Sequence, residues 1–156
     1  RPIVVCSGNP VDGRDPLHLA RLLMQIAELG LREQFLFVGL VPHEDLYSLI
    51  RQSKCVLNPS LFEGWSTTVE ESKSVGKRMV LSDLGVHQEQ APPASEYFDR
   101  TSPEDLADKM ALMWNDVPPG PDVAMEERAR AALPDRMIGF ANRFIEICDE
   151  AKQVRA

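Results

Sequence analysis

Short apolar runs alternate with amphipathic segments along most of this chain, and that alternation is the strongest constraint on its fold. The apolar runs predict β-strands at residues 2–7, 35–41, 54–59, 78–82 and 96–99. Between them, apolar side chains recur at helical spacing, which predicts helices at 17–29, 43–52, 67–75 and 102–114. Strands that alternate with helices are typical of a parallel, doubly wound α/β sheet, Rossmann-like and covered by helices on both faces.

The end of the chain follows a different pattern. Residues 118–121, with the sequence Pro-Pro-Gly-Pro, break the helix that precedes them. Residues 125–154 then predict a helical tail that is interrupted near Pro134 and has one apolar face. We therefore expect an α/β domain at 1–117 and a C-terminal helical extension at 118–156, which packs on the same domain.

Composition limits the partners and the compartment. The 156 residues suit a single domain, and the net charge of −7 argues against nucleic acid as a ligand. No apolar run approaches the roughly 18 residues that cross a bilayer. The three cysteines and three histidines lack metal-binding spacing, so we expect reduced cysteines and a cytosolic protein. Because strand-like sequence begins at Arg1, we also expect a further domain before it.

Polar residues collect after the predicted strands. Asn9 and Arg14 follow the first strand, Glu63 follows the third, and residues 83–89 follow the fourth. In parallel α/β sheets the carboxyl ends of the strands meet at one edge, where ligands bind. The sequence therefore predicts one binding cleft at that edge.

The junction between the third strand and the third helix carries two glutamates, Glu63 and Glu71, with seven residues between them. Such a junction points backbone N–H groups and the positive end of the helix dipole at whatever lies above it. Glutamates on either side can accept hydrogen bonds from sugar hydroxyls, so the pattern suits a ligand with central phosphates and a sugar at each end. The alternatives are a solvated acidic face and plain helix capping by Ser66, Thr67 or Thr68.

At these residues the chain resembles a known family. Residues 58–83 are similar to the donor-binding half of retaining GT-B glycosyltransferases, the glycosyl transferases group 1 family. That family carries Glu-x7-Glu in the context Pro-Ser-x-x-Glu-Gly, then Glu-[Ala/Ser] and Gly-x-Pro-[Ile/Val]. Here the matching segments are 59–64, 71–72 and 76–80, and weaker similarity extends over 4–114.

The resemblance implies a role for each matching residue. Glu63 would lie beside the transferred sugar as the catalytic residue, and Glu71 would accept hydrogen bonds from the nucleotide ribose. Backbone N–H groups would hold the donor sugar and diphosphate at Gly64, Trp65, Ser66, Thr67 and Thr68. Asn9 and Arg14 stand where the family usually has an arginine and a lysine that contact phosphate. No metal is implied, because N–H groups and one cation can stabilise the leaving diphosphate.

The implied reaction is transfer of a hexose from a nucleoside-diphosphate sugar, with retention, to a glycan or lipid-linked acceptor. Bacterial surface polysaccharide synthesis is the biology that the family suggests. The chain would be the C-terminal half of a GT-B fold, inactive alone, because a preceding domain would bind the acceptor. The family implies a cytoplasmic location, with any peripheral contact to the inner membrane made through the other half.

Two other functions stay open. A non-catalytic α/β domain that binds a nucleotide or sugar phosphate is favoured slightly by Asn9, which supplies no charge. A purely structural interaction domain is the third reading. Hydride transfer fits poorly, because no Gly-x-Gly-x-x-Gly follows the first strand. His87 is expected either on the surface or against the donor sugar.

Overall fold

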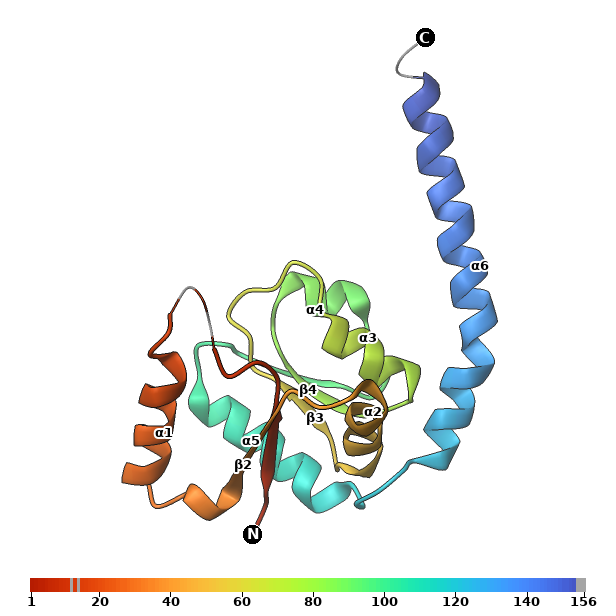
Figure 1. The fold of residues 1–156 in the computed structure, drawn as a ribbon. Coiled ribbons are helices and arrows are strands. Elements are labelled where there is room, and N and C mark those ends of the chain that lie inside the picture. Colours follow the sequence, from red (N-terminus) through yellow and green to blue (C-terminus); the bar gives the residue numbers. More distant parts are fainter. Residues whose placement is uncertain (12, 14, 154–156) are drawn as a thin grey trace. The chain divides into compact units, whose positions relative to one another are not determined.

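Parallel strands and helices alternate in the structure, as the sequence predicts. The computed structural model describes residues 1–11, 13 and 15–153. These divide into two units, Arg1–Leu49 and Ile50–Ala156, which are described separately below (Figure 1). The fold class is the α/β one expected, with the parallel strands distributed over two sheets, one in each unit.

The first unit contains one strand–helix–strand repeat. Strand β1 (Val4–Ser7) pairs in parallel with β2 (Phe35–Gly39), and α1 (His18–Glu28) and the short 3₁₀ helix η1 (Arg32–Gln34) connect them. Helix α1 ends where its sequence predicts, because Gly30 adopts a positive φ of 68° and closes the last turn through its N–H to the Ala27 carbonyl. Helix α2 (His43–Gln52) leads into the second unit.

The second unit is built on three parallel strands in the order β3 (Val56–Asn58), β4 (Met79–Ser82) and β5 (Glu96–Phe98). Its helices are α3 (Thr67–Ser74), α4 (Gly85–Gln90), α5 (Pro103–Asp116) and α6 (Val123–Gln153).

Alternate residues of β4 point to opposite faces of this sheet, and each face has its own helix. Met79 and Leu81 cluster with Val69 of α3. Val80 clusters on the other face with Phe98 and Met113, the latter on α5. The sheet is therefore covered on both sides, which confirms the doubly wound arrangement (Figure 1).

Two local expectations were wrong. Residues 85–90 form α4, although no cap residue or long apolar period marks a helix there. Helix α6 runs through Pro134 without the expected interruption. A proline inside a helix removes only its own N–H hydrogen bond, and the neighbouring turns on both sides keep the axis continuous here.

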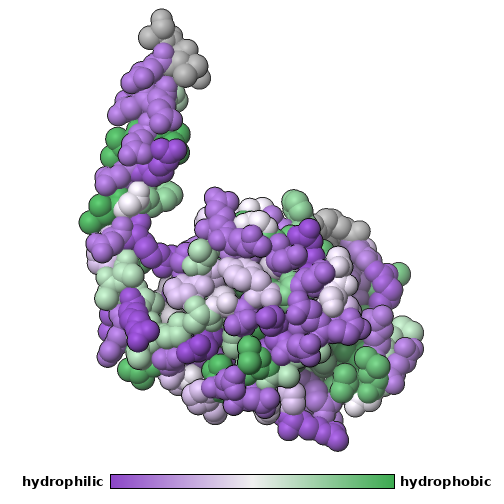
Figure 2. All heavy atoms as spheres, turned by 180° about the vertical axis from the view of Figure 1, so that it is seen from behind, coloured by the Kyte–Doolittle hydropathy of each residue, from purple (hydrophilic) through white to green (hydrophobic). Residues whose placement is uncertain are grey.

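Helix α6 contacts α2 and α3 near its start, and its later turns carry exposed side chains. Gly76, at the end of α3, has a φ of 64°, and a Cβ there would collide with the backbone of Met125. Arg51 binds Glu126 at 2.8 Å, and Arg136 binds Glu70 at 2.7 Å. Further along, apolar side chains are exposed, as Figure 2 shows in green: Met137, Ile138, Phe140, Phe144, Ile145 and Ile147. That this apolar face packs on the α/β domain stays a prediction.

Candidate functional site

The carboxyl end of β3 leads through a loop, residues 59–66, into α3. Glu63 lies on this loop, half-buried, with its Oε1 atom 2.8 Å from the Ser60 hydroxyl. The same hydroxyl is 2.7 Å from Oδ1 of Asn58, the last residue of β3. The predicted catalytic carboxylate is therefore at the strand end, as the sequence analysis expects, and is tied to the strand by side-chain hydrogen bonds.

Ser66 is the N-cap of α3, so one expected capping role is confirmed. Its hydroxyl accepts a hydrogen bond from the Val69 N–H at 3.4 Å and from the Asn58 amide at 2.9 Å. Thr67 and Thr68 are the first two helical residues, and neither of their N–H groups has an acceptor among the residues that the structure describes. The helix thus presents two free N–H groups between Glu63 and Glu71, where an anion can be held.

The adjacent glutamates Glu70 and Glu71 divide between two roles. Glu70 accepts hydrogen bonds from Arg136 at 2.7 Å and from the Gln90 amide at 3.1 Å. Both oxygens of its carboxylate are therefore used within the fold. Glu71 is half-buried, and its carboxylate has no hydrogen-bond partner within the described part of the chain. Of the two, only Glu71 keeps an unpaired carboxylate among the described residues; that it contacts the nucleotide ribose stays a prediction.

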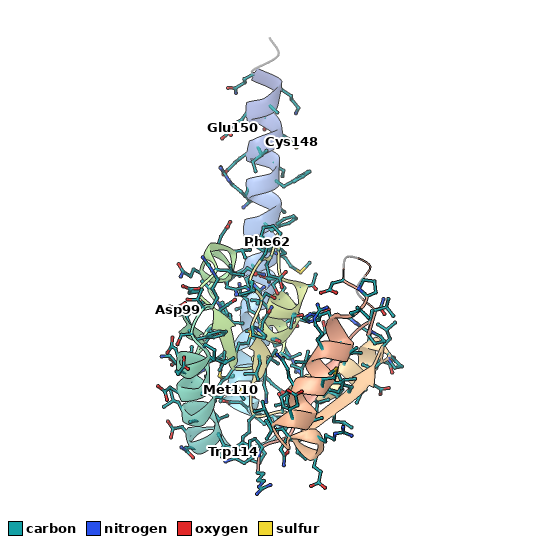
Figure 3. The ribbon with its side chains drawn as sticks, turned by 90° about the vertical axis from the view of Figure 1, so that its left-hand side faces the viewer. Phe62, Asp99, Met110, Trp114, Cys148 and Glu150 are labelled. Carbon is teal, nitrogen blue, oxygen red and sulfur yellow. The ribbon has the colours of Figure 1, made fainter. Side chains whose placement is uncertain are left out.

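The loop around Glu63 carries exposed apolar and small residues. Phe62, labelled in Figure 3, has 83% of its surface exposed, and Trp65 has 53%. Gly64 is also exposed. The loop is therefore accessible on the side that carries the predicted donor contacts.

His87 does not lie in either of its expected positions. It is fully buried, and its Nδ1 is 2.9 Å from the Ser82 carbonyl oxygen. Since a carbonyl only accepts, Nδ1 carries the proton and Nε2 is left as an acceptor. The Tyr97 hydroxyl also donates to the His87 carbonyl at 3.2 Å. His87 holds α4 against β4 and β5, a role that depends on a helix the sequence did not reveal.

The other predicted contacts lie in the first unit. Asn9 is exposed, and its Oδ1 accepts a hydrogen bond from the Val11 N–H at 3.0 Å, which forms an Asx turn after β1. Arg14 lies outside the described residues.

Two further features concern ligands and membranes. Among the residues that the structure describes, no three His, Cys, Asp or Glu side chains gather closely enough to hold a metal ion. Across residues 1–11, 13 and 15–153, no helix combines the length and apolar character needed to span a membrane.

Three solved structures have a fold similar to that of this chain. A glycosyltransferase from Rickettsia africae ESF-5 superposes with a TM-score of 0.69 at 20% identity, covering 86% of this chain and 35% of that one. Sucrose-phosphate synthase from Thermosynechococcus elongatus gives 0.65 at 18% identity, covering 91% and 38%. HepE from Anabaena, solved in complex with UDP, gives 0.62 at 16% identity, covering 86% and 41%. The chain thus spans well under half the length of these proteins.

Curated proteins include no match to this chain. The family model described as glycosyl transferases group 1, in contrast, matches residues 4–132 and therefore covers most of the sequence. That span includes both glutamates of the Glu-x7-Glu motif and every strand of both sheets. The chain belongs to the glycosyl transferases group 1 family.

Proposed function

We propose that this chain is the C-terminal, donor-binding domain of a retaining glycosyltransferase that transfers a hexose from a nucleoside-diphosphate sugar. One observation carries the proposal: the N–H groups of Thr67 and Thr68, which have no acceptor among the described residues, lie in the chain between two carboxylates, Glu63 and Glu71, after the end of β3. A donor with a diphosphate in the middle, a ribose at one side and a hexose at the other has the matching order of chemical groups.

The first turn of α3 would hold the diphosphate. As the glycosidic bond breaks, negative charge grows on the leaving phosphate, and fixed N–H donors stabilise that charge more in the transition state than in the ground state. The N–H groups of Gly64, Trp65 and Ser66 extend this surface along the loop. The Anabaena neighbour was solved with UDP, which supports a nucleoside diphosphate as the group bound here.

The two carboxylates would hold the two sugars. Glu71 would accept hydrogen bonds from the ribose hydroxyls, because its neighbour Glu70 is already occupied by Arg136. Glu63 would lie beside the transferred hexose and act as the catalytic residue. The family resemblance would also assign phosphate contacts to Asn9 and Arg14, with Arg14 supplying the positive charge. In this arrangement no metal ion is required.

The acceptor would be bound elsewhere in the full-length protein. Because the chain spans 35–41% of its structural neighbours, we propose that the remaining part binds a glycan or lipid-linked acceptor and makes any membrane contact. This chain alone would then be inactive. A cytoplasmic enzyme of bacterial surface polysaccharide synthesis is the setting we propose.

A non-catalytic domain that binds a nucleotide or sugar phosphate is the second candidate. One observation favours it: the Asn9 side chain supplies no charge, and its oxygen is engaged by the Val11 N–H. A domain with a weaker phosphate clamp could bind the nucleotide without activating its leaving group.

Two measurements on the full-length protein separate these candidates. The first is calorimetric titration with UDP, GDP and ADP, and the second is an assay of nucleotide release from the corresponding sugar conjugates. Binding together with turnover supports the transferase. Binding without turnover, in the presence of glycan and lipid-linked acceptors, favours the binding domain. Absence of binding to all three nucleotides would refute both.

A further inference from the structure

A buried amide joins the two halves of the proposed donor site. Asn58, at the end of β3, has 8% of its surface exposed. Its Nδ2 donates to the Ser66 hydroxyl at 2.9 Å, and its Oδ1 accepts from the Ser60 hydroxyl at 2.7 Å. One of these partners is the N-cap of α3 and the other contacts Glu63, so a single side chain touches both parts of the site.

Ser60 is the link between that amide and the proposed catalytic carboxylate. Its oxygen lies 2.8 Å from Oε1 of Glu63 and 2.7 Å from Oδ1 of Asn58. A serine has one hydroxyl proton, and two acceptors compete for it here. Which of the two acceptors receives this proton therefore depends on what else Glu63 contacts. The position of Glu63 in turn depends on Ser60, which the buried Asn58 amide holds in place.

A second set of hydrogen bonds anchors the other end of the loop. Gln90, at the end of α4 and 2% exposed, donates from Nε2 to the Ser66 carbonyl at 2.9 Å. The same Nε2 is 3.1 Å from Glu70, which in turn binds Arg136 of α6 at 2.7 Å. A side chain of α4 thus binds the Ser66 carbonyl, with α6 linked to it through Glu70, while β3 holds Ser60.

Hydrophobic packing does not explain why the loop keeps its shape. The apolar side chains between Ser60 and Ser66 point outward, since Leu61, Phe62 and Trp65 are all more than half exposed. Buried polar contacts must therefore fix the loop, and each such bond is stronger in a buried setting than in water.

We propose that Asn58 and Ser60 are positioning residues of the donor site. Asn58 sets the first turn of α3 through Ser66, and with Ser60 it sets the Glu63 carboxylate against the transferred sugar. The inference rests on the proposed function, because positioning Glu63 has a consequence for turnover only if sugar transfer occurs there. A displacement of about 1 Å in a reacting group can cost on the order of 100-fold in rate.

Ser60 gives the sharper test, because Asn58→Ala would leave buried polar groups unpaired and lower the melting temperature as well. Ser60→Ala removes only the bridging hydroxyl, and Ser60→Thr restores it. Ser53→Ala is a matched control, since Ser53 is also half-buried and its hydroxyl donates to the Ile50 carbonyl at 2.8 Å away from the loop.

The experiment uses the full-length protein and the donor, among UDP-glucose, GDP-mannose and ADP-glucose, that the wild type hydrolyses fastest. We expect Ser60→Ala to lower kcat by about 10- to 100-fold, with donor KM, affinity for the nucleoside diphosphate of that donor, and Tm close to wild type. Ser60→Thr should recover most of kcat, and Ser53→Ala should leave it unchanged. Glu63→Gln, measured beside them, reports whether the carboxylate matters at all.

Two results would overturn the inference while the proposed function stands. In the first, Ser60→Ala keeps wild-type kcat although Glu63→Gln is inactive. In the second, Ser60→Ala lowers Tm and the affinity for the nucleoside diphosphate of the donor in parallel with kcat, as loss of a structural residue would. If Glu63→Gln itself has wild-type kcat, the proposed function fails and the positioning role fails with it.

Discussion

The two ends of the three-stranded sheet use charged side chains in opposite ways. Two residues before β3 and β4 stand lysines, Lys54 and Lys77. Lys77 is 4% exposed, and its ammonium donates to the carbonyls of Arg51 and Gly120 at 3.0 Å each. At the other end, the carboxylates of Glu63 and Glu71 keep hydrogen-bonding capacity that the fold does not use.

The lysine end has both charge and a pocket, but the two ammonium groups bind carbonyls of the fold. A pocket of about 240 Å³ there is lined by Lys54, Lys77 and Arg78. Lys54, however, donates to the carbonyls of Trp114 and Val117 and packs over the Trp114 ring, so both ammonium groups close helix ends. Within the α/β part of this unit, Figure 3 labels Trp114 near one end and Phe62 near the other. Charge alone therefore does not mark a binding surface; side chains whose hydrogen-bonding capacity the fold leaves unused mark it better.

The largest effect that tests this contrast is expected at Glu63. Glu63→Ala in the full-length protein should lower turnover by about 10²- to 10³-fold, because a preorganised charge beside the reacting centre is lost. Tm should change little, since Glu63 is only half-buried and the Ser60 hydroxyl that it contacts keeps Asn58 as an acceptor. Glu127→Ala, on the exposed surface of α6, is the control and should keep full activity. Near-normal turnover of Glu63→Ala would remove the catalytic assignment.

Lys77 should show the reverse behaviour. Lys77→Met leaves the Arg51 and Gly120 carbonyls without their donor, and we expect a loss of about 2–3 kcal/mol in the free energy of unfolding by urea denaturation. UDP affinity should be unchanged once the protein is folded. Lys109→Met removes a partly exposed ion pair to Glu96 at 3.1 Å and should cost far less. If Lys77→Met instead weakened nucleotide binding without destabilising the fold, the pocket would be a ligand site.

The neighbouring glutamates of α3 repeat the contrast within one turn. Glu71→Gln should weaken UDP binding by about tenfold, the cost of weakening a hydrogen bond to a charged acceptor. Glu70→Gln should leave UDP affinity near wild type and weaken the contact with Arg136 instead. Calorimetry on the two variants decides between them, and an equal loss of affinity in both would mean that the division of roles is wrong.

Sequence patterns predicted the structure at helix ends that depend on residues close together in the sequence. Ser102 caps α5 and accepts from the Asp105 N–H at 3.1 Å, as its spacing predicts, and Gly30 and Gly76 end their helices. The Glu-x7-Glu frame likewise placed Glu63 on the loop after β3. Such patterns do not predict the position of a side chain whose hydrogen-bond partner is far away in the sequence.

Gln90 and His87 are the clearest such failures. Gln90 reaches the Ser66 carbonyl across 24 residues, and no periodicity marks it as buried. His87 is enclosed only because α4 packs on the sheet, and six residues are too few for a reliable helical period. The hydrogen bonds of Gln90 and His87 were therefore not predictable from the sequence, whereas the positions of Glu63 after β3 and of Glu71 in α3 were.

The smallest effect tests how charges at the lysine end contribute to stability. Arg51 donates two hydrogen bonds to Glu126, at 2.8 and 2.9 Å, which joins the end of α2 to the start of α6. The hydrogen bonds from Arg51 lower the pKa of Glu126 below its ordinary value of 4.5. The folded state thus favours the ionised carboxylate, so this contribution is complete above about pH 4.5 and is lost as the pH falls through the lower, folded-state pKa.

Arg51→Met should therefore cause only a small loss in the free energy of unfolding near pH 7, measured by urea denaturation, because the pair is partly exposed and screened. The difference from wild type should shrink as the pH falls below 4.5, where the unfolded state begins to take up the proton. Arg143→Met is the control: its partners Glu146 and Glu150 lie on the same exposed surface of α6, and no measurable loss is expected at any pH. A loss for Arg51→Met that stays constant with pH would mean that the arginine acts through the packing of its alkyl chain, and that charge at this end contributes no pH-dependent stability.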